Sequence, residues 1–348
     1  MTQMLTDTGN MLKDRRFLGK AVTIAFPVAM QGMLNTIVNL VDTMMIGTLG
    51  ETSIAAVGLA NKVFFVFSLL VFGIVSGAGV LAAQYWGNHD VKNIRKVLGL
   101  ALMISIAGSL CFLIPAQLCP EAVMRIFTTS QSSITVGAAY LAVVSLSYPC
   151  TAISNTYVAM LRAVGKVKAP VVISCITIGI NILFNYIFIF GHFGAPAMGA
   201  PGAALATMIA RIAECGALLA VTFISRSPLA CRIKELWGYS SAFLRQFAVT
   251  TGPVIANEFM WGLGTTMYSL AYGRMGDNAV AAITIATTIQ DIVVVLFQGL
   301  SAAAAVIVTV ASRGSFYIPW RDIFWTDYQT TDSFHSFIKD RLYELGTA

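Results

Sequence analysis

Long apolar stretches separated by short charged connections dominate the chain. Four of them contain no charged residue, namely Ala21 to Val41, Val63 to Asn88, Val97 to Pro120 and Ile126 to Leu161. Each is longer than the ~20 residues that an α-helix needs to cross a bilayer. A fifth, Ala169 to Ala210, contains a Gly- and Pro-rich segment that predicts a tight turn between two helices. Membrane β-strands would instead alternate polar and apolar residues. We therefore predict an all-α polytopic membrane protein.

This pattern predicts eight spans. They are expected at residues 21–46, 53–86, 97–118, 134–160, 169–190, 200–224, 246–272 and 279–311. Residues 21–225 form a complete six-helix N-lobe in this interpretation, and residues 246–311 form the first two helices of a second lobe. The other segments are a cytoplasmic N-terminus (1–20), a cytoplasmic inter-lobe linker (226–245) and a polar, aromatic tail (312–348).

Composition and charge agree with a membrane protein. The chain is 57% hydrophobic and 11% charged, whereas soluble proteins contain about 25% charged residues. Lys and Arg gather in every second connection, and the opposite connections carry only Arg125 and Arg274. By the positive-inside rule the N-terminus is cytoplasmic, so we expect a multi-pass protein of the plasma membrane. The net charge of +6 then requires no nucleic-acid partner.

An internal repeat relates the two ends of the apolar region. Pro27–Val80 resembles Pro253–Val306, with proline, glycine and alanine residues in the same register. Repeats of this length in apolar sequence are typical of transporters built from two pseudo-symmetric halves. From Arg313 onward the sequence becomes charged and aromatic. We expect the second lobe to be lost after its second helix, with a tail that is either a cytoplasmic segment or, preferentially, a frameshifted ending.

Polar side chains form a stripe along the first span. Gln31, Asn35, Asn39 and Asp42 follow at spacings that place them on one helix face. A charged Asp within the membrane costs about 2.5–3.5 kcal/mol, which favours a functional role for Asp42 in binding a proton or a cation. The amides either join helices or contribute to a binding site.

Other spans carry further candidates. Thr177, Asn181 and Asn185 share one face of the fifth span, and their oxygen atoms suit either a cation site or simple packing polarity. Arg211 and Glu214 are spaced i, i+3 in the sixth span, so we expect them to neutralise each other.

The seventh span contains a second carboxylate. Glu258 lies near Trp261 and Tyr268, and aromatic faces beside a carboxylate suit flat organic cations. Ordinary helix packing is the alternative for the aromatic residues. The repeat offers no acidic counterpart, since Gly32 aligns with Glu258 and Tyr268 with Asp42.

Other chemistries find little support. The six cysteines have no CxxC spacing and the three histidines form no ligand cluster, so we expect neither a disulfide framework nor a metal site of these residues. We also expect no cofactor. An intramembrane enzyme would need a HExxH, a paired catalytic Asp or a Ser/His motif, and the sequence contains none of these.

Several short motifs occur in a specific order and spacing, namely Pro27, Val41–Thr43, Gly47 and Gly50, residues 55–60, 82–87, 161–165, 180–189 and 199–207, and Pro253, Gly273 and Gly276. On these residues the chain resembles the multidrug and toxic compound extrusion (MATE) family. It implies two six-helix bundles that open alternately to each side of the membrane. It also implies export of organic cations in exchange for H⁺ or Na⁺.

The resemblance also assigns residues. It implies ion coupling through Asp42, Asn155, Asn181, Asn185 and, as a weaker match, Thr207. Asn185 stands where some members have a second Asp. The family's seventh-span Glu corresponds to Trp261, and Glu258 lies one turn earlier. The expected substrate-binding residues are Asn35, Asn39, Glu258, Trp261 and Tyr268, and Na⁺ would bind at Asp42 and Asn181.

The leading interpretation is therefore an ion-coupled antiporter for organic cations and drugs, expected to be a monomer in the bilayer. Two alternatives stay open. One is a flippase for lipid-linked saccharides from the same superfamily, although such substrates favour a cationic cavity. The other is an inactive, non-transporting fragment.

Overall fold

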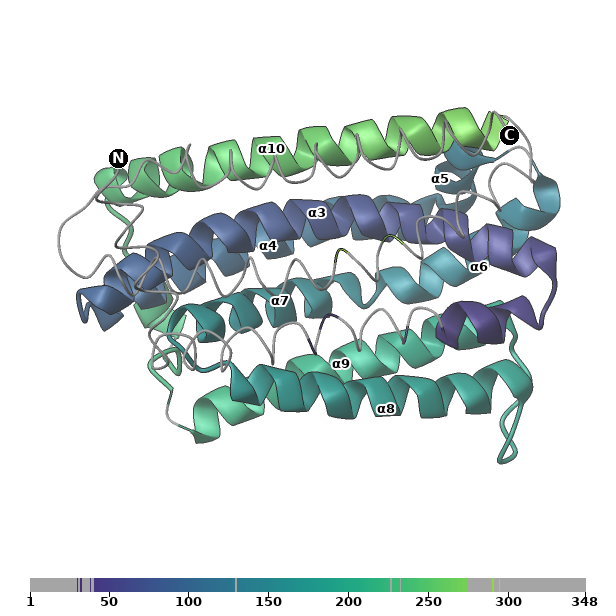
Figure 1. Ribbon diagram of the computed structural model, residues 1–348, viewed down its shortest axis with the longest axis horizontal. Coiled ribbons are helices and arrows are strands. Elements are labelled where there is room, and N and C mark those ends of the chain that lie inside the picture. The colour runs from purple at the N-terminus through teal and green to yellow at the C-terminus, as the bar shows by residue number, and fades with distance from the viewer. Residues whose placement is uncertain are drawn as a thin grey trace, which may run out of the picture. The chain divides into compact units, whose positions relative to one another are not determined.

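The computed structural model describes residues 41–128, 130–225, 227–231 and 233–274, and five single residues. Those five are Met30, Gly32, Val38, Gln290 and Val294. All regular structure in these ranges is helical (Figure 1). In chain order the elements are α3 (Glu51–Gly87), α4 (Val91–Leu118), α5 (Pro120–Phe127), α6 (Gln131–Ser145), α7 (Tyr148–Ala163), α8 (Lys168–Phe190), α9 (Ala200–Ile224), the 3-10 helix η1 (Ile233–Leu236) and α10 (Ser241–Arg274). Residues 41–47 are also helical.

The all-helical prediction is confirmed, and six of the eight expected spans correspond to described helices. Helices α3, α4, α8 and α9 are long and apolar enough to cross a membrane, and the pair α6–α7 counts as a fifth if it forms one span. Helix α10 occupies the expected seventh span but is more polar and is not among these helices. Most of the first span, the whole N-terminus, all but two residues of the eighth span, and the tail lie outside the described residues.

The fourth span departs from the prediction of one continuous helix over 134–160. Helices α6 and α7 meet at an angle of 50°, with Leu146 and Ser147 between them. Pro149 lies in the first turn of α7, where its missing N–H is tolerated, whereas it would break a helix that continued from α6. The short helix α5 begins at Pro120 in the same way.

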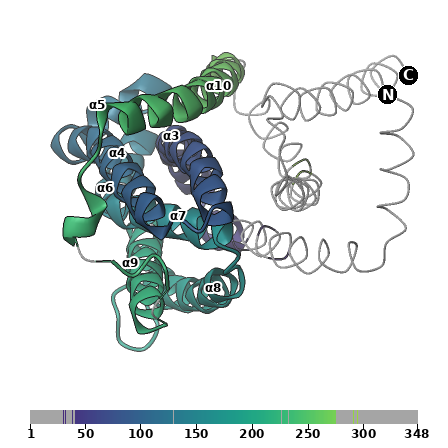
Figure 2. The same ribbon diagram turned by 90° about the vertical axis from the view of Figure 1, so that its left-hand side faces the viewer.

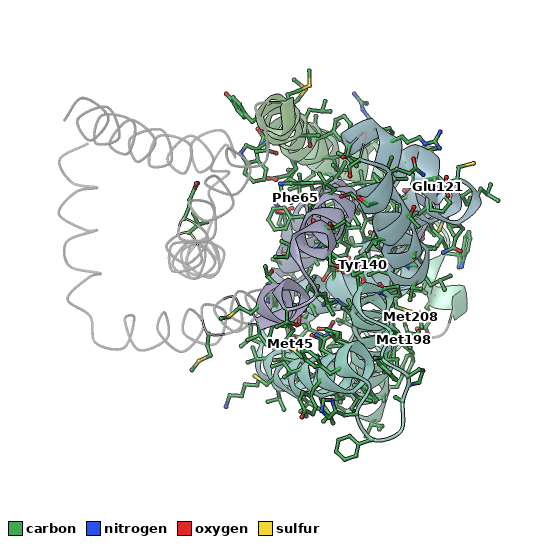
Figure 3. All side chains as sticks on the ribbon, turned by 90° about the vertical axis from the view of Figure 1, so that its right-hand side faces the viewer. Met45, Phe65, Glu121, Tyr140, Met198 and Met208 are labelled. Carbon is green, nitrogen blue, oxygen red and sulfur yellow. The ribbon has the colours of Figure 1, made fainter. Side chains whose placement is uncertain are left out.

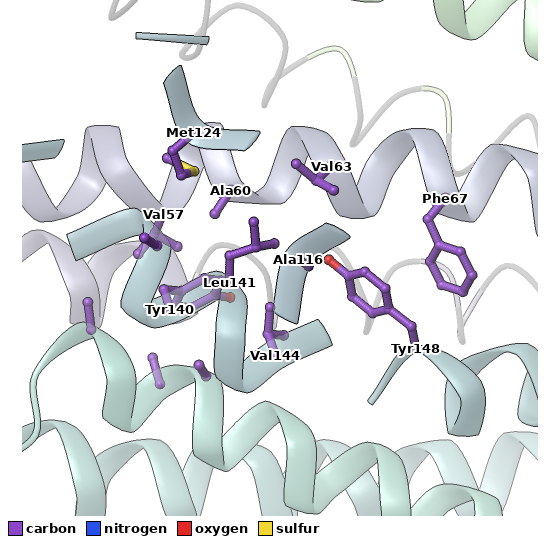
Figure 4. Close-up of a cluster of buried hydrophobic side chains, with 14 of the residues drawn as sticks. Val57, Ala60, Val63, Phe67, Ala116, Met124, Tyr140, Leu141, Val144 and Tyr148 are labelled. Atoms are coloured by element: carbon purple, nitrogen blue, oxygen red, sulfur yellow. The ribbon is translucent and has the colours of Figure 1, made fainter. Parts of the chain in front are cut away.

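Helix α3 lies at the centre of the described part. It packs against α4, α6, α7 and α10, and Figure 2 shows it between α10 and α7. On its inner face Phe67 stacks on Tyr148 of α7, with ring centroids 4.8 Å apart. Met124 of α5 and Leu141 of α6 are fully buried in the same cluster (Figure 4). This apolar cluster fixes the bent pair α6–α7 against α3.

The contact between α3 and α10 depends on glycine. An added Cβ on Gly73 would lie 2.8 Å from the Cα of Ile255, and one on Gly77 would lie 2.7 Å from the Cα of Thr251. These two helices therefore approach at backbone distance, as small residues allow in membrane proteins. The contact attaches the first helix of the predicted second lobe to the N-lobe.

The predicted inter-lobe linker is also bound to the N-lobe. Arg95 at the start of α4 donates to the Pro228 carbonyl oxygen at 3.0 Å, to the Glu235 carboxylate at 2.8 Å and to the Ala230 carbonyl oxygen at 3.4 Å. One planar guanidinium thus holds three acceptors of the segment before α10. The helix that follows is held as well, since the Tyr85 hydroxyl of α3 donates to the Gln246 side chain of α10 at 3.1 Å.

Gly77→Ala should destabilise the protein because the new methyl group meets the α10 backbone. Overpacking of this kind costs about 1–3 kcal/mol. Gly79→Ala is the matched control, since an added Cβ there meets nothing within 4 Å. Thermal unfolding in detergent should show a lower midpoint for Gly77→Ala only, and equal midpoints would contradict the close contact.

Arg95→Ala should release the linker. The loss of three hydrogen bonds, each contributing about 0.5–1.5 kcal/mol, should make residues 227–240 more susceptible to limited proteolysis. Lys92→Ala, a substitution of an exposed lysine in the same turn, serves as the control. Indistinguishable cleavage rates in the two variants would mean that Arg95 does not restrain this segment.

Candidate functional site

Four polar side chains from three helical segments are hydrogen-bonded in series. The Asn185 amide nitrogen donates to the Asp42 carboxylate at 2.5 Å and to the Asn181 side-chain oxygen at 3.2 Å. The Asn181 amide nitrogen in turn donates to the Thr207 hydroxyl at 3.4 Å. We call Asp42, Asn185, Asn181 and Thr207 the Asp42 network. The structure thus brings together four of the five predicted ion-coupling residues.

The local sequence explains why these residues meet. Asn181 and Asn185 are one turn apart on α8, and both are buried. Helix α9 returns alongside α8 after the turn between them (Figure 1). Gly202 permits this approach, since a Cβ there would lie 2.6 Å from the Phe188 carbonyl oxygen. Thr207 therefore lies beside Asn181. Residues 41–47 supply Asp42, the fourth member of the site.

One polar atom of the network has no partner among the residues that the structure describes. The side-chain oxygen of Asn185 is buried and accepts no hydrogen bond from any described residue. Buried polar atoms normally have partners, so an unpaired amide oxygen beside a carboxylate is a place for a water molecule or a hard cation. Carboxylate, amide and hydroxyl oxygens are the ligands that hard cations prefer. Within the described ranges, His, Cys, Asp and Glu side chains form no cluster of three or more.

An ion pair lies next to this network. Arg211 donates to the Glu214 carboxylate at 2.9 Å, which confirms the predicted i, i+3 pairing. The Ser174 hydroxyl donates to the other Glu214 oxygen at 3.2 Å. Arg211 also attracts Asp42 electrostatically. With Asp42 ionised, these three charged groups leave a local excess of one negative charge.

Sequence reasoning missed Tyr140 of α6. Its side chain is buried in the helix bundle (Figure 3), where the hydroxyl donates to the Asn61 side-chain oxygen at 3.4 Å. Tyr140 also lies close enough to Asp42 for an electrostatic interaction. The sequence held a weak signal, a tyrosine in the middle of an apolar span, because tyrosines favour the membrane interfaces.

The remaining predicted residues lie elsewhere or outside the described part. Asn155 of α7 is half-buried and makes no hydrogen bond to a described residue, so the structure does not connect it to the Asp42 network. Glu258 of α10 is half-buried, while Trp261 and Tyr268 are exposed. Trp261 also packs against Phe65 of α3, with ring centroids 6.0 Å apart. Asn35 and Asn39 lie outside the described residues.

Asn185→Leu should destabilise the protein, because it removes the donor shared by Asp42 and Asn181. Each buried acceptor left without a donor costs about 1–3 kcal/mol. The matched control is Asn155→Leu, which breaks no hydrogen bond within the described residues. A lower thermal midpoint for Asn185→Leu than for Asn155→Leu is expected. The reverse order would contradict the hydrogen-bonded series.

Known proteins resemble this chain in sequence. Residues 27–187 match the family model described as MatE. The probable multidrug resistance protein NorM of Thermotoga maritima is 26% identical over 291 residues, which cover 82% of this chain and 61% of that protein. Multidrug resistance protein PmpM of Pseudomonas aeruginosa is 25% identical over 310 residues, which cover 85% of this chain and 62% of that protein. The chain thus spans less than two thirds of these relatives.

Solved structures share the fold. A structure described as the outward-facing conformation of a multidrug resistance MATE family transporter of the MOP superfamily aligns with a TM-score of 0.72 at 21% identity. The alignment covers 83% of this chain and 63% of that one. A MOP superfamily transporter from Pyrococcus furiosus aligns with a TM-score of 0.71. Together with the match of residues 27–187 to the MatE family model, these likenesses make the chain similar to transporters of the MATE family.

Proposed function

We propose that this chain forms the ion-coupling part of an antiporter that exports organic cations in exchange for H⁺ or Na⁺. The observation that carries the proposal is the Asp42 network, in which a half-buried carboxylate lies beside an unpaired amide oxygen. Both atoms attract a cation or a proton, and neither would be stable in the membrane without a ligand or a partner.

Local charge supports a cationic coupling ion. Arg211 interacts with both Asp42 and Glu214, so a proton or Na⁺ bound at Asp42 would bring the cluster to neutrality. For Na⁺, the ligands would come from Asp42 and the side-chain oxygens of Asn181 and Asn185. Occupancy of this site would alter the contact between residues 41–47 and α8, which is where alternating access would be coupled to the ion.

Helix α10 provides the candidate surface for the substrate. Glu258 is half-buried and Trp261 is 54% exposed, so a carboxylate and an aromatic ring are both accessible to a flat cation. The relatives named as multidrug resistance proteins support drugs as the substrate class. The excess negative charge at the Asp42 network disfavours the pyrophosphate-bearing substrates of a lipid-linked saccharide flippase. We place the transporter in the plasma membrane as a monomer, with its N-terminus in the cytoplasm.

Asp42→Asn should strongly reduce ion-coupled efflux. The asparagine keeps the size of the side chain and can still bond to Asn185, but it cannot bind a proton and offers a cation no charge. Coupling energies of about 1–3 kcal/mol correspond to a 5- to 150-fold effect, so efflux should fall at least fivefold. The assay is ethidium efflux from a pump-deficient bacterial host.

The assay compares the chain alone with a version fused to the C-terminal region of the Thermotoga maritima relative, each with and without Asp42→Asn. Glu121→Gln, which changes an exposed carboxylate in α5, is the control and should preserve efflux. Efflux that stops with a protonophore indicates H⁺ coupling, and efflux that stops without Na⁺ indicates Na⁺ coupling. Undiminished, gradient-dependent efflux by Asp42→Asn in the fused version would overturn the proposal.

A further inference from the structure

An open pocket lies where α4 begins and α9 ends. It has a volume of about 290 Å³ and is lined by Arg95 of α4, Phe223 of α9 and three residues of the segment before α10, namely Ala230, Cys231 and Glu235. Both α4 and α9 are long and apolar enough to cross a membrane. The volume is close to the lower limit of the roughly 300–1,000 Å³ that is usual for small-molecule sites, so the pocket suits a small polar group.

The wall that the segment before α10 contributes is fixed against α4. Besides the hydrogen bonds of Arg95 described above, the backbone of this segment lies directly on Gly99, where an added Cβ would collide with the Leu236 carbonyl oxygen. The Tyr239 hydroxyl donates to the same carbonyl oxygen at 2.5 Å. The pocket is therefore formed before any ligand binds, which reduces the ordering cost of binding.

The described lining residues include one cation and one anion. Arg95 donates to Glu235 at 2.8 Å, and their side chains remain 28% and 45% exposed. Three described acceptors engage Arg95, and its guanidinium has more N–H donors than three acceptors need. A carboxylate likewise accepts more hydrogen bonds than the one from Arg95. The pair is electrically neutral as a whole, yet it offers a ligand both donors and an acceptor.

Aromatic residues place the pocket at the depth of lipid headgroups. Trp237 follows the pocket wall, is 54% exposed and packs against Tyr239 with ring centroids 6.4 Å apart. Trp and Tyr gather at membrane–water interfaces. Phe223, which lines the pocket near the end of α9, is 51% exposed. This arrangement suits a ligand whose polar part enters the pocket while its apolar part stays in the bilayer.

We propose that this pocket binds the headgroup of a zwitterionic aminophospholipid, a phosphodiester that carries a primary ammonium group. The phosphate accepts from the Arg95 guanidinium, whose planar fork matches phosphate oxygens. The ammonium donates to the Glu235 carboxylate, and Phe223 borders the start of the acyl chains. An anionic headgroup would place an uncompensated charge beside Glu235, and a choline headgroup offers that carboxylate no N–H donor.

The test titrates the full chain in detergent with phosphatidylethanolamine, phosphatidylglycerol and phosphatidylcholine of identical acyl chains, and native mass spectrometry measures the bound lipid. Phosphatidylethanolamine should bind about tenfold more tightly than the other two, the difference that one charge-assisted hydrogen bond provides. Phosphoethanolamine, the soluble headgroup, should bind at least about tenfold more weakly than the lipid because it lacks apolar chains. Equal affinity for this compound would indicate a soluble ligand and contradict a lipid site.

Glu235→Gln should remove the preference for phosphatidylethanolamine. The glutamine keeps the size of the side chain and still accepts from Arg95, so the fold is at little risk, but it offers the ammonium group no charge. Phosphatidylethanolamine and phosphatidylglycerol should then bind with equal affinity. Glu121→Gln, which changes an exposed carboxylate of α5, is the matched control and should keep the preference of the parent chain.

Cys231 reports where the lipid binds, since it lines the pocket. Its alkylation by a maleimide, followed by peptide mapping, should slow at saturating phosphatidylethanolamine. Alkylation of Cys119, an exposed cysteine at the other end of α4, should be unchanged.

Three results would overturn the proposal. They are equal binding of the three lipids by the parent chain, an undiminished preference in Glu235→Gln, and an unaltered alkylation rate of Cys231 at saturating lipid. All of them are measured without transport, so they stand or fall separately from the proposed antiport.

Discussion

A carboxylate inside a membrane helix bundle needs partners that replace water, and the described site is organised around that constraint. Asp42 receives the Asn185 amide at 2.5 Å, and Asn185 must in turn be positioned by Asn181 and Thr207. The bond between Asn181 and Thr207 requires α8 and α9 to lie side by side in a fixed register. At Gly202 α9 approaches the backbone of α8 closely. This contact therefore positions the residues of the Asp42 network in addition to packing the two helices.

The contacts of α3 connect this site to the rest of the molecule. On one side Phe67 stacks on Tyr148, which fixes the bent pair α6–α7. On the other side Gly77 lets α10 approach to backbone distance. Since Tyr140 of α6 lies near Asp42 and α10 carries Glu258, α3 is the physical link between the candidate ion site and the candidate substrate surface.

Much of the fold followed from the sequence because membrane helices satisfy their own backbone hydrogen bonds. Length and apolarity alone then locate the segments that became α3, α4, α8, α9 and the pair α6–α7. The 50° bend before Pro149 was not predicted, because apolar composition is uniform across it. Asn181 and Asn185 were predicted to share a face, since that relation is internal to one helix.

Relations between helices were decided by tertiary structure. The sequence by itself determined the helical segments, the polar face of α8 and the rarity of a membrane carboxylate such as Asp42. Only the packing decided that Thr207, Asn181, Asn185 and Asp42 form one hydrogen-bonded series and that Asn155 lies apart from it. The physical reason is that helical periodicity fixes directions within a helix, whereas contacts between helices depend on side-chain volumes and glycine positions at each crossing.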